Sequence, residues 1–141
     1  DEDVTRHLHS VSVDAAVSAV SAVGRVREIM VAEQRRLASE GGVVMVGRDI
    51  GTVVLPEAPL KIYLTATART RAERRYKDFV SAGEDVDFEE VLKSMEERDR
   101  ADSSRANSPL RPAEDAKVVD TDQLTMDEVV DCLFELLEGI I

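Results

Sequence analysis

The sequence has one cysteine, Cys132, among 141 residues, and no long apolar run. A single thiol excludes an internal disulfide framework and a multi-cysteine zinc site. No apolar stretch approaches the ~20 residues that a helix needs to cross a bilayer. The first residues, Asp-Glu-Asp, have neither the basic start nor the apolar stretch of a secretion signal. These absences predict a cytoplasmic protein that does not enter a membrane.

Positive charge is also scarce, because 18 lysines and arginines face 29 aspartates and glutamates, for a net charge of -11. This balance argues against a protein that coats nucleic acid or an anionic membrane. Arginines nevertheless cluster within residues 25–36, 69–75 and 98–111. An acidic protein with local arginine clusters is the expected layout when the bound anion is small, such as a nucleotide.

The sequence predicts four helices. Apolar residues recur at helical spacing over residues 13–38. Thr67, Asp87 and Thr125 each stand where an N-cap side chain is expected, the last two with a glutamate three residues on. These caps predict helices that run to about residue 82, over about 88–104, and from Thr125 onward.

Short apolar runs at residues 43–46, 60–64 and 117–120 predict strands that are covered on both faces. Strands that alternate with helices in this way are typical of an α/β fold, a three-layer parallel sheet with crossover helices. Such a sheet usually has more than three strands. We therefore expect this one to be incomplete.

Three arginine-containing segments are candidate sites. The first is the segment at 47–52, Gly-Arg-Asp-Ile-Gly-Thr, which directly follows a predicted strand. It is either a ligand site, because ligands of parallel sheets bind at the ends of strands, or a plain solvated turn. On the helix over 88–104, Arg98, Asp102 and Arg105 share a face and form either a phosphate clamp or a surface ion-pair ladder. The helix that runs to about residue 82 carries Arg71, Arg74 and Arg75. These arginines either bind an anion or lie on a solvated helix face.

Four ordered blocks resemble the signature segments of bacterial cytidylate kinases. They cover residues 17–27, 47–66, 97–105 and 109–121, and the similarity runs in order from about Val13 to near the end of the chain. The resemblance implies the fold of the P-loop nucleoside monophosphate kinases and transfer of the γ-phosphoryl group of ATP to CMP or dCMP, with Mg²⁺. It also implies one domain over residues 1–141, with a monophosphate-binding part at about 1–38 and a lid at about 71–105.

The resemblance further implies roles for individual residues. Ser18, Arg27 and Asp49 resemble the residues that read the cytosine ring, with Asp49 accepting from the exocyclic amine. Arg48 resembles a holder of the CMP phosphate.

Arg98 and Asp102 resemble partners of the sugar hydroxyls, and Arg105 resembles a phosphate clamp on the mobile lid. Arg71 and Arg75 match lid arginines near the base and phosphates of ATP. The catalytic residues implied in this way are Arg48, Arg98 and Arg105.

The sequence departs from the family in three places. Nothing in it matches Gly-x-x-x-x-Gly-Lys-Ser/Thr, the loop that holds ATP and its magnesium, so we expect the chain as given to be inactive and to resemble the C-terminal two-thirds of a family member. Val46 replaces a usual acidic residue, and His9 with Ser10 replaces an Arg-Thr pair.

Two other interpretations stay open. The chain could be a non-catalytic module that captures a nucleotide or a partner. It could also form a rearranged or swapped oligomer through an open sheet edge, whereas the complete enzyme would be a monomer.

Overall fold

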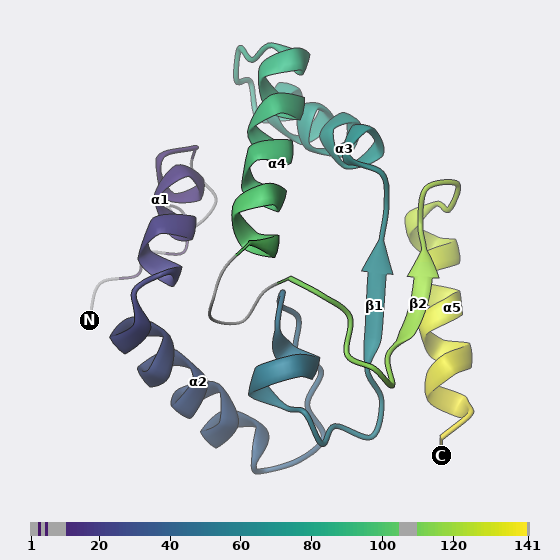
Figure 1. Ribbon diagram of the computed structural model, residues 1–141. Helices are drawn as coiled ribbons and strands as arrows, with labels where there is room; N and C mark the ends of the chain where they lie inside the picture. The colour runs from purple at the N-terminus through teal and green to yellow at the C-terminus, as the bar shows by residue number, and fades with distance from the viewer. Residues whose placement is uncertain (1–2, 4, 6–10, 105–109, 141) are drawn as a thin grey trace.

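The computed structural model describes residues 3, 5, 11–104 and 110–140, apart from the side chains of residues 11, 12, 14, 15 and 18. The described residues form five α-helices, one π-helix and one two-stranded parallel sheet (Figure 1). In chain order the elements are α1 (Val11–Ser21), α2 (Gly24–Ala38), the π-helix η2 (Ile50–Val54), β1 (Ile62–Thr65), α3 (Ala68–Ser81), α4 (Phe88–Ser103), β2 (Lys117–Asp120) and α5 (Met126–Glu138).

The sheet is formed by β1 and β2, which pair in parallel with Ile62 opposite Lys117 and Thr65 opposite Asp120. The crossover between the two strands contains α3 and α4, which pack against each other as a hairpin beyond the carboxyl ends of the strands (Figure 1). After β2 the chain turns back into α5, which runs in the opposite direction to the strand (Figure 1). The predicted α/β class with parallel strands is confirmed. The three-layer arrangement stays a prediction, because the described sheet has two strands.

The predicted strand over residues 43–46 is wrong. These residues form no ladder, and the side chains of Val44 and Val46 are 91% and 92% exposed. A strand requires a neighbour to pair its backbone N–H and C=O groups. Within the described part of the chain, β1 and β2 pair with each other, and no third strand lies beside this segment.

The predicted helix over residues 13–38 is two helices. The backbone leaves helical geometry at Val23 (φ -73°, ψ 112°), and α2 starts at Gly24. Valine and glycine both have low helix propensity. The hydroxyl of Ser21 also donates a hydrogen bond to the carbonyl of Val17 at 2.6 Å, a contact that favours bending at a helix end. The apolar spacing continues through the break, so periodicity did not reveal it.

The three predicted caps are confirmed. The side chains of Thr67, Asp87 and Thr125 accept hydrogen bonds from the backbone N–H groups three residues on, at the first turns of α3, α4 and α5. Thr125 and Glu128 form a complete capping box. These local interactions fix where three of the helices begin.

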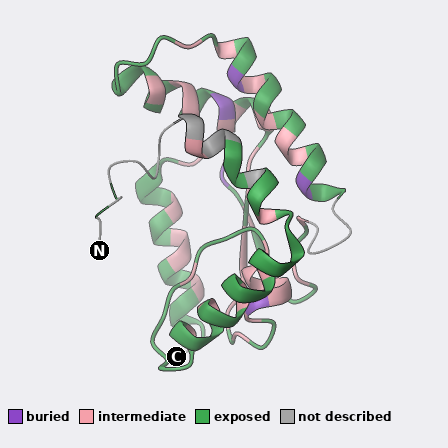
Figure 2. Cartoon of the chain, turned by 90° about the vertical axis from the view of Figure 1, so that its left-hand side faces the viewer, coloured by how far each residue is buried: buried purple, intermediate pink, exposed green. Residues whose placement is uncertain are grey.

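The hydrophobic core is small. Among the described residues, Val54, Ala72 and Val91 are the buried hydrophobic side chains, and most of the chain in Figure 2 is exposed or half-buried. The accessible surface is 10566 Å², whereas a compact protein of 15.5 kDa exposes about 7200 Å². The chain therefore leaves far more surface uncovered than a compact protein of its mass.

Candidate functional site

The turn at residues 47–49 carries the central pair of candidate side chains, Arg48 and Asp49. It connects the exposed segment after α2 to η2. A Cβ atom at Gly47 would lie 2.9 Å from Cδ1 and Cγ1 of Ile50, so glycine leaves the space that the Ile50 side chain occupies. This close packing sets the direction in which the turn enters η2.

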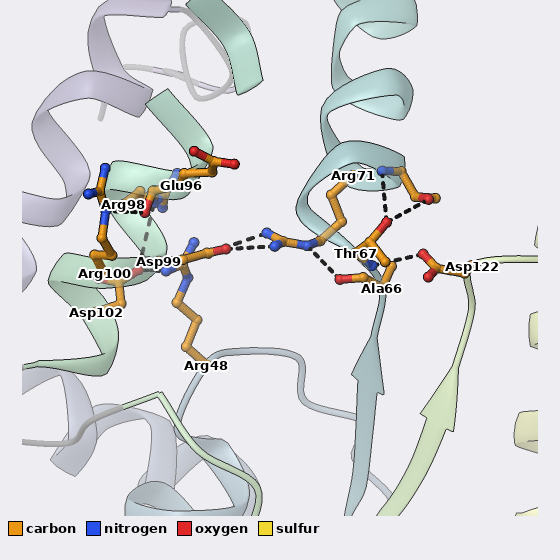
Figure 3. Close-up of polar contacts among 11 residues, drawn as sticks. Arg48, Ala66, Thr67, Arg71, Glu96, Arg98, Asp99, Arg100, Asp102 and Asp122 are labelled. Atoms are coloured by element: carbon orange, nitrogen blue, oxygen red, sulfur yellow. Dashed lines mark hydrogen bonds and ion pairs between the residues drawn. The ribbon is translucent and has the colours of Figure 1, made fainter. Parts of the chain in front are cut away.

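Arg48 reaches from the turn to α4. Its guanidinium forms an ion pair with Asp102, whose side chain is 2% exposed (Figure 3). Arg98, one helical turn before Asp102, also approaches this carboxylate, with Nε 3.9 Å from Oδ2. Two arginines from different elements therefore converge on one buried carboxylate, of which the sequence had grouped only Arg98 with Asp102.

Asp49 faces the other way, toward α2. Its carboxylate forms an ion pair with Arg27, and the two side chains are 14% and 19% exposed. Because Arg48 and Asp49 are adjacent in the chain, the turn joins α2 on one side to α4 on the other.

The cluster contains three guanidinium groups, those of Arg27, Arg48 and Arg98, and two carboxylates. Each carboxylate has at least one guanidinium partner, which is what allows Asp102 to be buried and Asp49 to be largely shielded from solvent. Guanidinium groups bind phosphate oxygens in pairs of hydrogen bonds, and a neighbouring carboxylate accepts from amines and hydroxyls. The cluster can therefore hold a small ligand that carries both an anionic group and hydrogen-bond donors.

Arg71 and Arg75 lie on α3, and Arg71 adjoins the cluster through Asp99. Arg71 donates to both carboxylate oxygens of Asp99, at 2.6 and 3.3 Å, and to the carbonyl of Ala66 at 3.1 Å (Figure 3). The guanidinium carbon of Arg75 lies 4.5 Å from the centre of the Phe79 ring. Arg71 thus connects the end of β1 to α4, next to Arg98.

Sequence reasoning missed the contacts that fix α3 to the sheet. Arg74 donates to the hydroxyl and the carbonyl of Thr121 at 3.0 and 2.5 Å, and Thr121 is 5% exposed. Asp122 accepts from the N–H of Thr67 at 2.8 Å, and this backbone hydrogen bond lowers the pKa of the Asp122 carboxyl. The sequence placed Arg74 with Arg71 and Arg75 on a helix that meets an anion or solvent, but it did not identify a partner that lies 47 residues away in the chain.

Some predicted residues lie outside the described part of the molecule. Arg105 is among residues 105–109, and His9 and Ser10 are among residues 6–10. Ser18 belongs to α1, but its side chain is not described.

Two kinds of feature are absent from the described residues. No described helix is both long and apolar enough to cross a membrane. No group of three or more His, Cys, Asp and Glu side chains within the described ranges could hold a metal ion.

The fold and the cluster together indicate a class of protein, the α/β proteins that bind small phosphorylated ligands. Arginines and carboxylates from a turn and two helices meet near the carboxyl end of a parallel strand pair, which is where α/β proteins bind small phosphorylated ligands. The comparison with known proteins narrows this class. The family model of cytidylate kinase matches residues 1–139, so the chain belongs to the cytidylate kinase family.

Individual relatives agree with the family match. A cytidylate kinase of Desulforamulus reducens is 52% identical over 136 residues, which are 96% of this chain and 61% of the relative. The cytidylate kinase of Rhodococcus opacus is 55% identical over 130 residues (92% and 57%), and that of Corynebacterium glutamicum is 51% identical over 138 residues (97% and 60%). The chain spans about three-fifths of the length of these relatives.

Proposed function

We propose that this chain forms the nucleoside monophosphate side of an enzyme that transfers the γ-phosphoryl group of ATP to CMP or dCMP and produces CDP or dCDP. The observation that carries the proposal is the double attachment of the 47–49 turn. Arg48 meets the Asp102 and Arg98 pair of α4, while Asp49 meets Arg27 of α2. Family membership identifies the kind of nucleotide that such a cluster would bind.

In this proposal Asp49 and Arg27 read the base, with help from Ser18. Asp49 accepts a hydrogen bond from the exocyclic amine of cytosine, and Arg27 donates to the acceptor edge of the ring. Uracil presents a carbonyl in place of the amine, which would leave the carboxylate repelled and unpaired. The low exposure of both side chains supports this role, because a shielded carboxylate discriminates more strongly than a solvated one.

The phosphate and the sugar are assigned to the other arginines. Arg48 would hold the CMP phosphate, Arg98 and Asp102 the sugar hydroxyls, and Arg105 the phosphates as the lid closes. Arg48, Arg98 and Arg105 are the proposed catalytic residues. When the phosphate binds Arg48, it takes over from the carboxylate of Asp102 as the partner of that guanidinium.

Arg71 and Arg75 are proposed to meet ATP from the lid, which consists of residues 71–105. Arg71 now pairs with Asp99, so the ATP phosphates would compete with this carboxylate for the guanidinium. Phosphoryl transfer needs little covalent help from the protein, and these residues would act by positioning the two nucleotides and neutralising charge. Mg²⁺ would accompany ATP, but the described residues offer no carboxylate cluster for it, and we assign no Mg²⁺ ligand to them.

At the level of the whole chain, we propose that residues 1–141 belong to a single kinase domain that works in the cytoplasm, with residues 1–38 in its monophosphate-binding part. The 141 residues contain no Gly-x-x-x-x-Gly-Lys-Ser/Thr loop. By themselves they are expected to be inactive and not to bind ATP productively.

The experiment is a calorimetric titration of CMP, dCMP, UMP and AMP into the natural polypeptide that contains this chain, followed by an assay for CDP with ATP. We expect CMP and dCMP to bind more tightly than UMP and AMP, and CDP to form. CMP binding no tighter than UMP or AMP binding would refute the base-reading roles of Asp49 and Arg27.

A second candidate function is a module that captures a nucleotide without catalysis. Val46 favours it, because this residue is 92% exposed next to the turn, where the family usually has an acidic side chain. Selective CMP binding without any CDP formation in the same assay would support this alternative.

A further inference from the structure

Arg35, in the last turn of α2, makes a contact that none of the roles above uses. Its Nε donates a hydrogen bond to the carbonyl oxygen of Val54 at 2.9 Å, and its Nη2 donates to that of Val53 at 2.6 Å. Both carbonyls belong to the C-terminal end of η2, and Val54 is 1% exposed. One planar guanidinium therefore binds two consecutive carbonyls of the π-helix.

The same two residues of η2 hold Asp49. The N–H groups of Val53 and Val54 donate to the carbonyl of Asp49 at 2.9 and 3.3 Å. Val53 and Val54 therefore each link Arg35 to Asp49, because each accepts from the guanidinium through its carbonyl and donates to the Asp49 carbonyl through its N–H group. A displacement of Val53 or Val54 would be transmitted directly to the residue that is proposed to read the base.

Helix α2 consequently holds the segment 49–54 at both ends. Arg27 pairs with the Asp49 side chain at the start of η2, and Arg35 binds the carbonyls at its end. The two arginines are about two helical turns apart, so they point to the same side of α2. π-helical turns are rare and often occur at functional sites.

We propose that Arg35 is a positioning residue for base recognition. By clamping the end of η2 to α2, it fixes the direction of the Asp49 carboxylate relative to Arg27, and it thereby sharpens the discrimination between cytosine and uracil. This inference rests on the proposed function, in which Asp49 accepts from the cytosine amine. Arg35 itself touches no base in this assignment.

The chain offers a matched control in the neighbouring residue. Arg36 lies in the same helical turn, but its side chain is 62% exposed and pairs with Glu33 within α2, at 2.6 and 3.0 Å. Arg36→Ala removes the same charge without touching η2. Arg35→Lys keeps the charge, but an ammonium cannot reproduce the planar two-carbonyl geometry.

The test is the ratio of CMP affinity to UMP affinity, measured by calorimetry in the natural polypeptide that contains this chain. We expect Arg35→Ala to lower the ratio about tenfold, the effect of losing one well-oriented hydrogen bond. Arg35→Lys should give a ratio between those of Arg35→Ala and the wild type, and Arg36→Ala should keep the wild-type ratio. If Arg35 only stabilised the fold and did not orient Asp49, its removal would leave the affinity ratio unchanged. The ratio therefore distinguishes a positioning role from a general contribution to stability.

The outcomes distinguish this inference from the proposed function. A wild-type protein that does not prefer CMP would overturn the proposed function and, with it, this inference. A wild-type protein that prefers CMP, together with a folded Arg35→Ala variant of unchanged ratio, would overturn the role of Arg35 and leave the proposed function standing. Should Arg35→Ala not fold, Arg35→Lys decides, and a wild-type ratio in that variant would contradict the inference.

Discussion

Asp102 shows at the residue scale how the candidate site is held together without a ligand. It is the most deeply buried charged side chain of the described residues, at 2% exposure, and it lies between Arg48 and Arg98. A buried carboxylate is tolerated where guanidinium groups balance its charge. Removal of its charge leaves two partly exposed guanidinium groups, those of Arg48 and Arg98, close to each other without a shared carboxylate. Asp102 therefore supports both the structure of the cluster and its proposed use.

Asp102→Asn tests this arrangement. The amide keeps the size of the side chain but removes the charge, so the free energy of unfolding should fall by about 1–3 kcal/mol, because Asp102 loses charge-assisted contacts while Arg48 and Arg98 stay partly solvated. Urea unfolding measures the change. Glu33→Gln is the control, because it breaks the exposed pair with Arg36 and should change stability by less than about 0.5 kcal/mol. Equal effects of the two substitutions would show that Asp102 is not a buried charge.

Asp122 predicts a pH dependence at the start of α3. The hydrogen bond from the N–H of Thr67 lowers the pKa of the Asp122 carboxyl below its ordinary value of 3.8. A carboxyl with a lowered pKa in the folded state stabilises the protein above the unfolded pKa, and this contribution is lost as the pH falls through the folded pKa. The Thr67 amide signal in NMR spectra should therefore titrate with a midpoint below 3.8, and Asp122→Asn should abolish the titration. A midpoint above 3.8 would contradict the contact.

At the scale of elements, local signals were sufficient for the capped helices and for the strands near residues 60–64 and 117–120, but they failed at residues 43–46. The caps at Thr67, Asp87 and Thr125 involve residues three positions apart, so the sequence contains all of the information needed to place them. A strand depends on a neighbour that is distant in the chain. Residues 43–46 have the composition of a buried strand, but the described sheet gives them no partner, and they remain unpaired.

The entry into η2 depends on the space beside Gly47. An added Cβ atom would lie 2.9 Å from Ile50 Cδ1 and Cγ1, so Gly47→Ala should displace the Ile50 side chain and destabilise the protein by about 1–3 kcal/mol. Ile50→Ala removes both of the atoms that would clash. In a double-mutant cycle, Gly47→Ala should therefore cost less in the Ile50→Ala background than in the wild type. Additive effects on the free energy of unfolding would contradict this packing.

At the scale of the whole molecule, the main feature is the amount of uncovered surface. The chain exposes 10566 Å², about 3400 Å² more than a compact protein of this mass. Large apolar side chains contribute to the excess, among them Val44, Val46 and Met126 at 91%, 92% and 77% exposure. Exposed apolar surface of this extent favours association.

We therefore expect the 141-residue chain to self-associate. Sedimentation velocity should show a mean mass that rises with concentration. A monomer of 15.5 kDa at all concentrations would contradict the expectation.

The candidate site was partly predictable because its parts are close in the sequence or share a helix face. Arg48 and Asp49 are adjacent, and Arg98 and Asp102 are one helical turn apart. That these two groups meet is a consequence of the crossover between β1 and β2, which local spacing does not determine. The proposed role of Arg35 could not be predicted from the sequence either, because its acceptors are backbone carbonyls and no side-chain pattern marks them.

The most direct test of the account is the nucleotide preference of an Asp49→Asn variant of the natural polypeptide, measured as the ratio of CMP to UMP affinity. The wild-type carboxylate accepts hydrogen bonds and should favour CMP. An asparagine amide both accepts and donates, so it can pair with either base, and the preference for CMP should be lost. A variant that keeps the wild-type preference for CMP would show that Asp49 does not read the base.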